Sequence, residues 1–238
     1  MKKLTTALLL LAVAFASTSC KKDVIGAGPI VTQNRMVAPF TAIDLRMNGN
    51  VYYKKDSVWK VEVTAKQSLH ASLETSVTNG QLTIRYSNGK TYDADESIRI
   101  NVSAPDVASL KLASSGSIFC TTDITPASLF LLSAGSGSIF LQGVNTGNLK
   151  AQSLQSGTIT ATGGTAANEE LKTDASGKID LKEVATKTAS VRIIGSGYIK
   201  VKVADHLNAT IDGSGSVYFT GFPTLTTQIS GTGRLVRL

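Results

Sequence analysis

The chain has 238 residues and a formal net charge of +7, from 24 Lys and Arg against 17 Asp and Glu. Its basic residues are scattered, and no run of them lies beside aromatic residues, which argues against a nucleic-acid partner. The two cysteines are Cys20 and Cys120.

Residues 1–19 are predicted to be an export signal rather than part of the fold. Lys2 and Lys3 form a basic start, and the apolar run over 4–16 is too short for a membrane-spanning helix. The run ends in small residues followed by Cys20, which resembles a bacterial lipoprotein signal. The resemblance implies that cleavage leaves Cys20 as the first residue, carrying acyl chains. A plain secretory signal with an incidental cysteine is the alternative.

Residues 20–39 are predicted to be a tether, because a stretch with Gly and Pro follows the charged Lys21, Lys22 and Asp23. By resemblance to lipoprotein sorting, Lys rather than Asp after the lipidated cysteine implies the outer membrane rather than inner-membrane retention. Lys-Lys-Asp is also similar to a shortened form of the signals that send some lipoproteins to the cell surface. The expected location is therefore the outer membrane, through a lipid anchor, on its periplasmic face or at the cell surface.

The folded part is expected to begin at Phe40 and to form a single domain over 40–238. Residues 43–53 alternate between apolar and polar on both sides of Gly49, which predicts two strands around a bend. Further on, Leu69, Leu73 and Val77 lie four residues apart, which predicts one short helix within 66–77. Strands that continue the fold are expected at 59–63, 82–84 and 98–102, with an exposed loop over 87–96.

The second half of the chain repeats a short phrase of small residues centred on glycine. The central glycines lie 21, 20, 20, 20, 18 and 18 residues apart, and Gly49 behaves as an eighth marker ahead of them. The repeated central positions are Gly116, Gly137, Gly157, Gly177, Gly197, Gly215 and Gly233. A period near 20 residues is typical of a solenoid.

Side chains alternate around each of these glycines. The second residue after it is Ile, Val or Leu in every repeat, and the sixth before it is usually apolar or small, whereas the fifth before it is mostly polar. A period of two predicts a strand on each side of the bend. Apolar columns also recur at the seventh residue after it (Val144, Val184, Ala204, Phe222) and the eighth before it (Leu129, Leu149, Leu207, Leu225).

The predicted fold is therefore all-β: a parallel β-helix with three short sides and about 20 residues per coil, with one inserted helix. The bend glycines are expected to adopt positive φ and to let neighbouring coils approach. An inward polar column at Ser133, Ser153 and Thr173 must then find hydrogen bonds inside the coil.

A known family carries the same motifs. Phe-x-x-Ile-x-Leu at 40–45, Gly-Asn-Val-Tyr at 49–52 and the later Ser-Gly-Ser-Ile coils resemble the putative auto-transporter adhesins with a head GIN domain, which are bacterial lipoproteins. The resemblance covers roughly residues 40–222. It implies an envelope protein with an adhesion role and supplies no catalytic residue.

Few residues are placed for chemistry. His70 and His206 are the only histidines and have no Cys or carboxylate at ligand spacing, so neither a metal site nor a cofactor is expected. An acidic cluster in the expected loop could hold Ca²⁺, although a solvated loop is favoured: Asp93, Asp95 and Glu96. Cys120 falls at an inward position, which favours a small buried apolar residue over a nucleophile, and with Cys20 lipidated no disulfide within the chain is expected.

A glycan-cleaving enzyme would need carboxylates, or a carboxylate with a basic partner, on one face of the β-helix. The third position after each glycine is outward and brings Asp180 and Lys200 onto adjacent coils. A solvated ion pair explains them better than a lyase or hydrolase site. The protein is therefore predicted not to be an enzyme.

The same outward column contains Phe119 and Phe140, and Leu132 is expected nearby. An exposed apolar patch often marks a contact site, although an N-terminal strand or the inserted helix could cover this one. The favoured function is a binding or adhesion module for a glycan or a surface partner, with Phe119, Phe140 and Leu132 as the candidate patch. A structural envelope scaffold without a specific ligand is the alternative, and a polysaccharide lyase or hydrolase is a remote one. The oligomeric state is left open.

Overall fold

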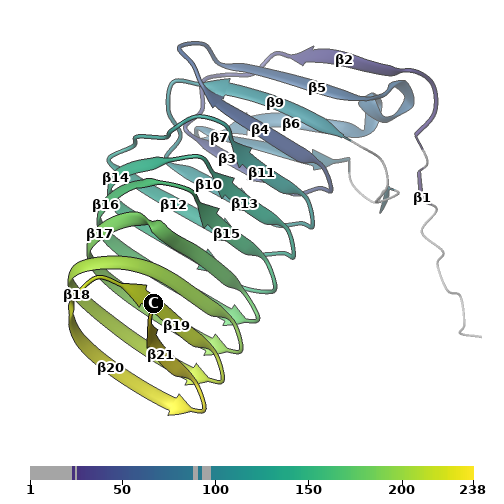
Figure 1. Cartoon of the computed structure of the whole chain (residues 1–238). Helices are drawn as coiled ribbons and strands as arrows, with labels where there is room; N and C mark the ends of the chain where they lie inside the picture. The colour runs from purple at the N-terminus through teal and green to yellow at the C-terminus, as the bar shows by residue number, and fades with distance from the viewer. Residues whose placement is uncertain (1–22, 25, 88–90, 93–97) are drawn as a thin grey trace, which may run out of the picture.

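The computed structural model describes residues 23–24, 26–87, 91–92 and 98–238. It is a β-solenoid of about 6 turns with about 20 residues per coil and one very short helix, as the repeat predicted. The coils stack along one axis from the N-terminal strands to the last coil, which carries the C-terminus (Figure 1). Cys20 and the acidic cluster at 93–96 lie outside the described residues.

Each regular coil places one strand before its central glycine and one after it, and strands of successive coils pair in parallel. The strands before the bend are β10 (Ser109–Leu112), β12 (Ser128–Ser133), β14 (Val144–Ser153) and β16 (Gly164–Ala175). Those after it are β11 (Ser117–Cys120), β13 (Ser138–Leu141) and β15 (Thr158–Ala161). Towards the C-terminus they continue as β17 (Lys178–Gly195), β18 (Tyr198–Gly213), β19 (Ser216–Thr220), β20 (Thr224–Gly231) and β21 (Arg234–Arg237).

The core consists of inward columns in which like residues stack. Ile118 lies opposite Ile139, which lies opposite Ile159, and all three are fully buried. The column at the sixth position before the glycine is likewise buried from Leu110 to Ala209. The alternation seen in the sequence therefore marks which side chains face the interior.

The first coil belongs to the same parallel array. It comprises β3 (Ala42–Leu45) and β4 (Asn50–Lys55), which pair on one side with β10 and β11. On their other side they pair in parallel with β7 (Gln81–Tyr86) and β9 (Arg99–Ala104). Antiparallel strands then extend this end: β2 (Ile30–Arg35), β5 (Lys60–Lys66) and β6 (Leu73–Thr78). Two further strands of two residues each, β1 (Asp23–Val24) and β8 (Thr91–Tyr92), pair with each other in parallel.

Two predictions for the N-terminal region need correction. The helix is the 3-10 helix η1 (Gln67–Ser72), and Leu73 and Val77 lie in β6, opposite Tyr86 and Leu82 of β7. A spacing of four is even, so it also keeps two residues on one face of a strand, and the pairing with β7 decides between the two structures. The predicted tether contains β2, because residues 30–35 pair antiparallel with β5.

The central glycines let neighbouring coils approach closely, as predicted, but they do not adopt the positive φ that was also expected. Positive φ occurs two residues before the central glycine in the later coils, at Gly195, Gly213 and Gly231, and also at Ala175. The central glycines are needed for close approach instead. A Cβ on Gly157 would overlap the hydroxyl of Ser133 and lie 2.8 Å from the carbonyl oxygen of Gly135.

Two inward columns also depart from expectation. Ser133 and Ser153 donate to the carbonyls of Gly137 and Gly157, at 3.3 and 2.8 Å, but the Thr173 hydroxyl has no partner among the described residues. In the shorter 18-residue coils, a register shift sets Val203 opposite Thr186. Val203 is therefore buried, whereas Ala204 and Phe222, which the sequence assigned to the third buried side, are exposed.

Candidate binding site

Three aromatic rings form a row on the outside of the strands that follow the bend. The ladder sets Tyr52 of β4 opposite Phe119 of β11, and Phe119 opposite Phe140 of β13. The Tyr52 and Phe119 rings are stacked with centroids 5.1 Å apart, and Phe119 and Phe140 are tilted at 6.5 Å. We call Tyr52, Phe119 and Phe140 the aromatic row.

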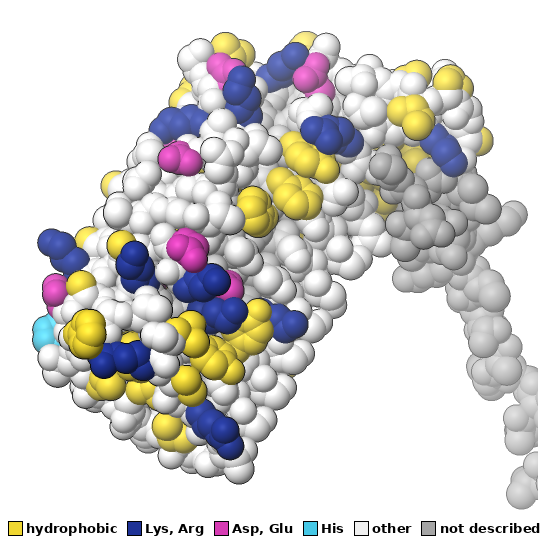
Figure 2. All heavy atoms as spheres, in the orientation of Figure 1, with side chains coloured by type: hydrophobic (Ala, Val, Ile, Leu, Met, Phe, Trp, Pro, Cys, Tyr) yellow, Lys and Arg dark blue, Asp and Glu magenta, His cyan; other side chains and the backbone are white. Residues whose placement is uncertain are grey.

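The row has one closed end and one open end. The Arg99 guanidinium lies over the Tyr52 ring, 3.6 Å from its centroid, so that face is occupied. Phe140 is 36% exposed, and its next neighbour in the ladder is the small Thr160 of β15. The row is visible as hydrophobic side chains over β4, β11 and β13, on the face turned to the viewer (Figure 2). The ring available to a ligand is therefore Phe140, with an apolar ridge behind it.

A polar groove of about 340 Å³ lies at the closed end of the row. Tyr52 and Arg99 line it together with Asn101, Glu62 and Lys60. Arg99 donates to the Asn101 side chain at 3.1 Å, and Lys60 forms an ion pair with Glu62 at 2.8 Å. Hydrogen-bond donors and acceptors thus line the groove beside the Tyr52 ring.

A second groove, of about 680 Å³, crosses the strands before the bend. It is lined by Phe130 of β12, the Lys150–Glu170 ion pair, and the side chains of Asn148 and Asn168, among others. Leu132 also lies on β12, but its ladder neighbours are Lys111 and Gln152, and it lines a third groove of about 320 Å³. The structure therefore puts Leu132 on a different strand ladder from Phe119 and Phe140.

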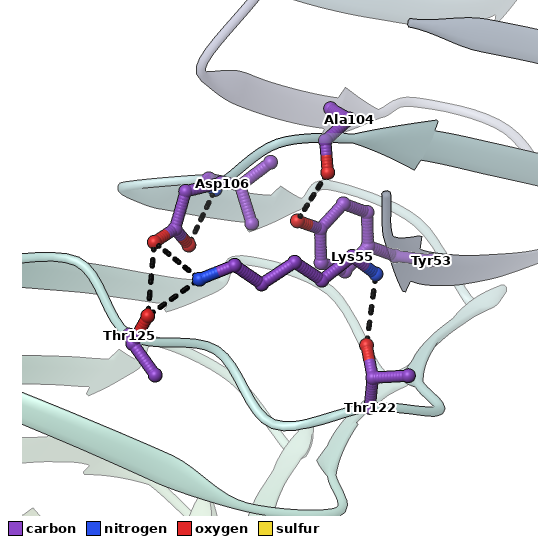
Figure 3. A network of polar contacts seen from close by, with 7 residues as sticks. Tyr53, Lys55, Ala104, Asp106, Thr122 and Thr125 are labelled. Carbon is purple, nitrogen blue, oxygen red and sulfur yellow. Dashed lines mark hydrogen bonds and ion pairs between the residues drawn. The ribbon is translucent and has the colours of Figure 1, made fainter. Parts of the chain in front are cut away.

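A cluster of Lys55, Asp106, Thr125 and Tyr53 could be mistaken for catalytic machinery (Figure 3). The Lys55 ammonium donates to Asp106 at 3.1 Å and to Thr125 at 2.5 Å, and the Tyr53 hydroxyl donates to the carbonyl of Ala104 at 3.2 Å. Burial, reinforced by the charge of Asp106, raises the pKa of Tyr53 well above its ordinary value. These contacts join β4 to the end of β9 and to the segments that follow β9 and β11, so the cluster fastens the first coil to the next one.

The Asp180–Lys200 pair lies where the sequence placed it, on adjacent strands with 3.0 Å between the charged atoms. The hydrogen bond to Asp180 raises the pKa of Lys200 above its ordinary value. A catalytic base needs the opposite shift, because a lysine must lose its proton to accept another. The pair is an ion pair on the surface, as expected.

The remaining candidates are the two histidines and Cys120. The His70 ring lies in the core and reaches the carbonyl oxygens of Val31 and Ala65 at 3.1 and 3.3 Å, whereas His206 is exposed on β18. Cys120 is buried, and burial raises the pKa of its thiol far above the ordinary value, as its inward position predicted. Within the described ranges, no three His, Cys, Asp or Glu residues gather closely enough to hold a metal ion.

Glu169 is the unusual buried residue of the regular coils. It lies on β16 between Leu149 and Ala189 in an inward column, and 3% of it is exposed. Neither carboxyl oxygen has a hydrogen-bond partner in the described part of the chain. Burial raises the pKa of Glu169 to about 8, so the neutral acid is the stable form in the fold at neutral pH.

Tyr52 and Glu169 could both have been found from their offsets to a marker glycine. Tyr52 is the third residue after Gly49, the same offset that Phe119 and Phe140 have from their own glycines. Glu169 is the eighth residue before Gly177, where the other repeats have leucine or alanine. Arg99 precedes the repeats and had no comparable signal.

Comparisons with known proteins agree with this architecture. A family model described as "Putative auto-transporter adhesin, head GIN domain" matches residues 39–223. The chain belongs to this family. The head GIN domain therefore has nearly the bounds that its motifs predicted, and family membership supports a binding or adhesion role in a surface or envelope protein. A comparison with curated proteins gave no match.

Solved structures share the fold of this head GIN domain. A putative adhesin from Bacteroides fragilis is 20% identical with a TM-score of 0.86, covering 90% of this chain and 100% of that one. A putative lipid binding protein from Parabacteroides distasonis is 23% identical with a TM-score of 0.76, covering 91% and 100%. A putative adhesin from Parabacteroides merdae is 19% identical with a TM-score of 0.73, covering 91% and 99%. In the described part of the head GIN protein, no helix has the length and apolar character needed to cross a membrane.

Proposed function

We propose that the protein is a lipid-anchored binding module of the cell envelope that recognises a glycan through the open end of the aromatic row. The observation that carries the proposal is the outward stack of Tyr52, Phe119 and Phe140, which ends at an exposed ring beside the small Thr160. A sugar ring has an apolar face that can pack on such a ring. Its hydroxyl groups need donors and acceptors close by.

The surroundings of the row supply those groups. Thr160 adds a hydroxyl next to Phe140, and the groove at the other end offers the amide of Asn101 and the charges of Arg99 and Glu62. The volume of this groove, about 340 Å³, falls in the range of roughly 300–1,000 Å³ typical of small-ligand clefts. An extended glycan lying across the strands would meet both ends of the row.

The test is a glycan and cell-wall screen of the full chain, followed by the same screen on Phe140→Ser. Truncating an aromatic hot spot typically costs about 2 kcal/mol or more of binding free energy, about thirtyfold in affinity. Phe140 is the better target than Phe119, which lies half-buried between two rings and would also lose packing. The melting temperature of Phe140→Ser should stay within a few degrees of the parent.

Phe130→Ser is the matched control, because Phe130 is also an outward phenylalanine, in the same coil but beside the second groove. It should leave binding unchanged. Loss of binding in Phe130→Ser alone would place the ligand in the second groove, and full binding by Phe140→Ser would refute the aromatic row. Release of shorter products from any bound glycan would favour the lyase or hydrolase alternative. No glycan binding at all would leave a surface-protein partner or a structural scaffold.

The anchor is tested separately through Cys20→Ala. Each buried methylene contributes roughly 0.8 kcal/mol to membrane association, so several acyl chains would hold the protein firmly. The variant should appear in the aqueous fraction after cell lysis, while the parent requires detergent. Continued detergent-dependent association of Cys20→Ala would refute the anchor without affecting the proposed glycan site.

A further inference from the structure

Among the described residues, no strand pairs beyond the coil formed by β20 and β21. Within the described part of the chain, β20 pairs with β18 alone and β21 with β19 alone, so one edge of each strand is free. All eight residues of β20 are exposed. In Figure 1 these two strands form the terminal turn of the stack, at the end opposite β2 and β5.

The free edge also exposes the end of the core. Leu225 and Ile229 continue inward columns whose previous members, Leu207 and Ile211, are buried. In the described chain, Leu225 is 45% and Ile229 is 46% exposed. The uncovered surface is therefore a cross-section of the core bounded by two strand edges.

The edge of β20 lacks the features that normally prevent strand pairing, whereas β21 carries the exposed Arg234 and Arg237. Residues 224–231 read Thr-Leu-Thr-Thr-Gln-Ile-Ser-Gly and contain neither a charge nor a proline. Natural edge strands are usually protected by charges, prolines, bulges or a covering segment. A long uncharged edge of this kind is a template for another strand.

The geometry points to a second copy of this chain as the occupant, bound end to end through β20. An antiparallel pair with its two-fold axis at Thr227 places Leu225 of one copy opposite Ile229 of the other, twice, on the inward face. Both cores then continue into each other, and no like charges meet along β20. A single foreign peptide strand could pair with β20 but would leave the edge of β21 open. Head-to-tail stacking of copies is disfavoured, since antiparallel strands extend the other end.

The test uses the full chain with Cys20→Ser, which removes the lipid but leaves the edge intact. At tens of micromolar, light scattering should give twice the mass of one chain. Thr227→Lys places two ammonium groups at the axis and should halve that mass without changing the circular dichroism spectrum. A monomeric parent, or a Thr227→Lys variant that remains dimeric, would overturn the proposal.

Disulfide trapping checks the register independently. Thr227→Cys sets two thiols across the axis and should give a covalent dimer on a non-reducing gel after mild oxidation. Thr165→Cys, at an exposed position of β16, is the matched control and should remain monomeric. Equal cross-linking of the two variants would show random collision and overturn the assigned register.

Discussion

At the N-terminal end of the solenoid, β5 runs antiparallel to β2 and β9 and buries Val61, Val63 and Ala65 against the core. At the C-terminal end the equivalent core residues of β20 are nearly half exposed. The regular coils between the two ends repeat one packing arrangement, in which each core residue contacts the equivalent residue of the next coil. A stack of like coils always ends in an open core surface, so a segment that departs from the repeat is needed to cover it.

The largest effect is expected where the regular coils approach most closely. A Cβ on Gly157 would overlap the Ser133 hydroxyl and crowd two backbone carbonyls, so Gly157→Ala should cost about 2–3 kcal/mol of stability. That corresponds to a fall of roughly 5–10 °C in melting temperature. In the first coil, a Cβ on Gly49 would meet chiefly the mobile end of Met47 at 3.1 Å. Gly49→Ala should therefore cost less than about 1 kcal/mol.

Gly163→Ala is the control for this pair, because, its chain neighbours aside, no heavy atom of the described residues lies within 4 Å of the added Cβ. Its stability should stay within about 0.5 kcal/mol of the parent. If thermal melting gave equal losses for Gly157→Ala and Gly49→Ala, the distinction between regular coils and the first coil would fail.

The second effect concerns the buried carboxyl groups of the two regions. Asp44, in the first coil, accepts hydrogen bonds from Arg46 at 2.8 Å and Gln81 at 3.2 Å, whereas Glu169 has no such partner among the described residues. The pKa of Glu169 is raised from 4.5 to about 8, so its contribution to stability is fully present below about pH 4.5. It is lost as the pH rises towards about 8. Glu169→Gln should remove this loss, and its stability should vary less over that pH range.

Denaturant unfolding at several pH values measures the change. Asp44→Asn is the comparison, and it should destabilise the protein by about 1–3 kcal/mol at neutral pH, because a charged acceptor of two hydrogen bonds is lost. A wild-type stability that rises between pH 5 and 8 relative to Glu169→Gln would contradict the assignment of Glu169 as a neutral acid.

The smallest effect is expected at Ala175, which has φ of 53° where the later coils have Gly195, Gly213 and Gly231. Glycine adopts this conformation without steric cost, so Ala175→Gly should stabilise the protein by about 0.5–1 kcal/mol. Ala185→Gly, at an exposed strand position, should destabilise it by a similar amount. Melting curves in which both variants lose stability would mean that residue 175 does not share the bend of the later coils.

The repeat explains why most of the solenoid was predictable. A fixed spacing of glycines brings equivalent positions of successive coils into register. The alternation of side chains around each glycine then predicts Ile118, Ile139 and Ile159 in the core, and Phe119 beside Phe140 on the outside. The N-terminal end was less predictable, because β2 and β5 pair through residues some 30 positions apart that share no repeat. The alternation of side chains also could not show that Phe119 is partly covered. To see this, Tyr52 has to be aligned with Phe119 through their equal offsets from Gly49 and Gly116.

Because each coil rests only on its neighbours, the molecule resembles a one-dimensional chain of coupled units. An internal coil must break two interfaces to open, whereas the coil of β20 and β21 must break only one. In a single, unpaired copy of the described chain, thermal opening is therefore expected to start at the C-terminal coil and to advance inwards as a front. The antiparallel strands cover the N-terminal end and protect it from opening first. The solenoid is therefore expected to unfold from its C-terminal end towards its N-terminal end.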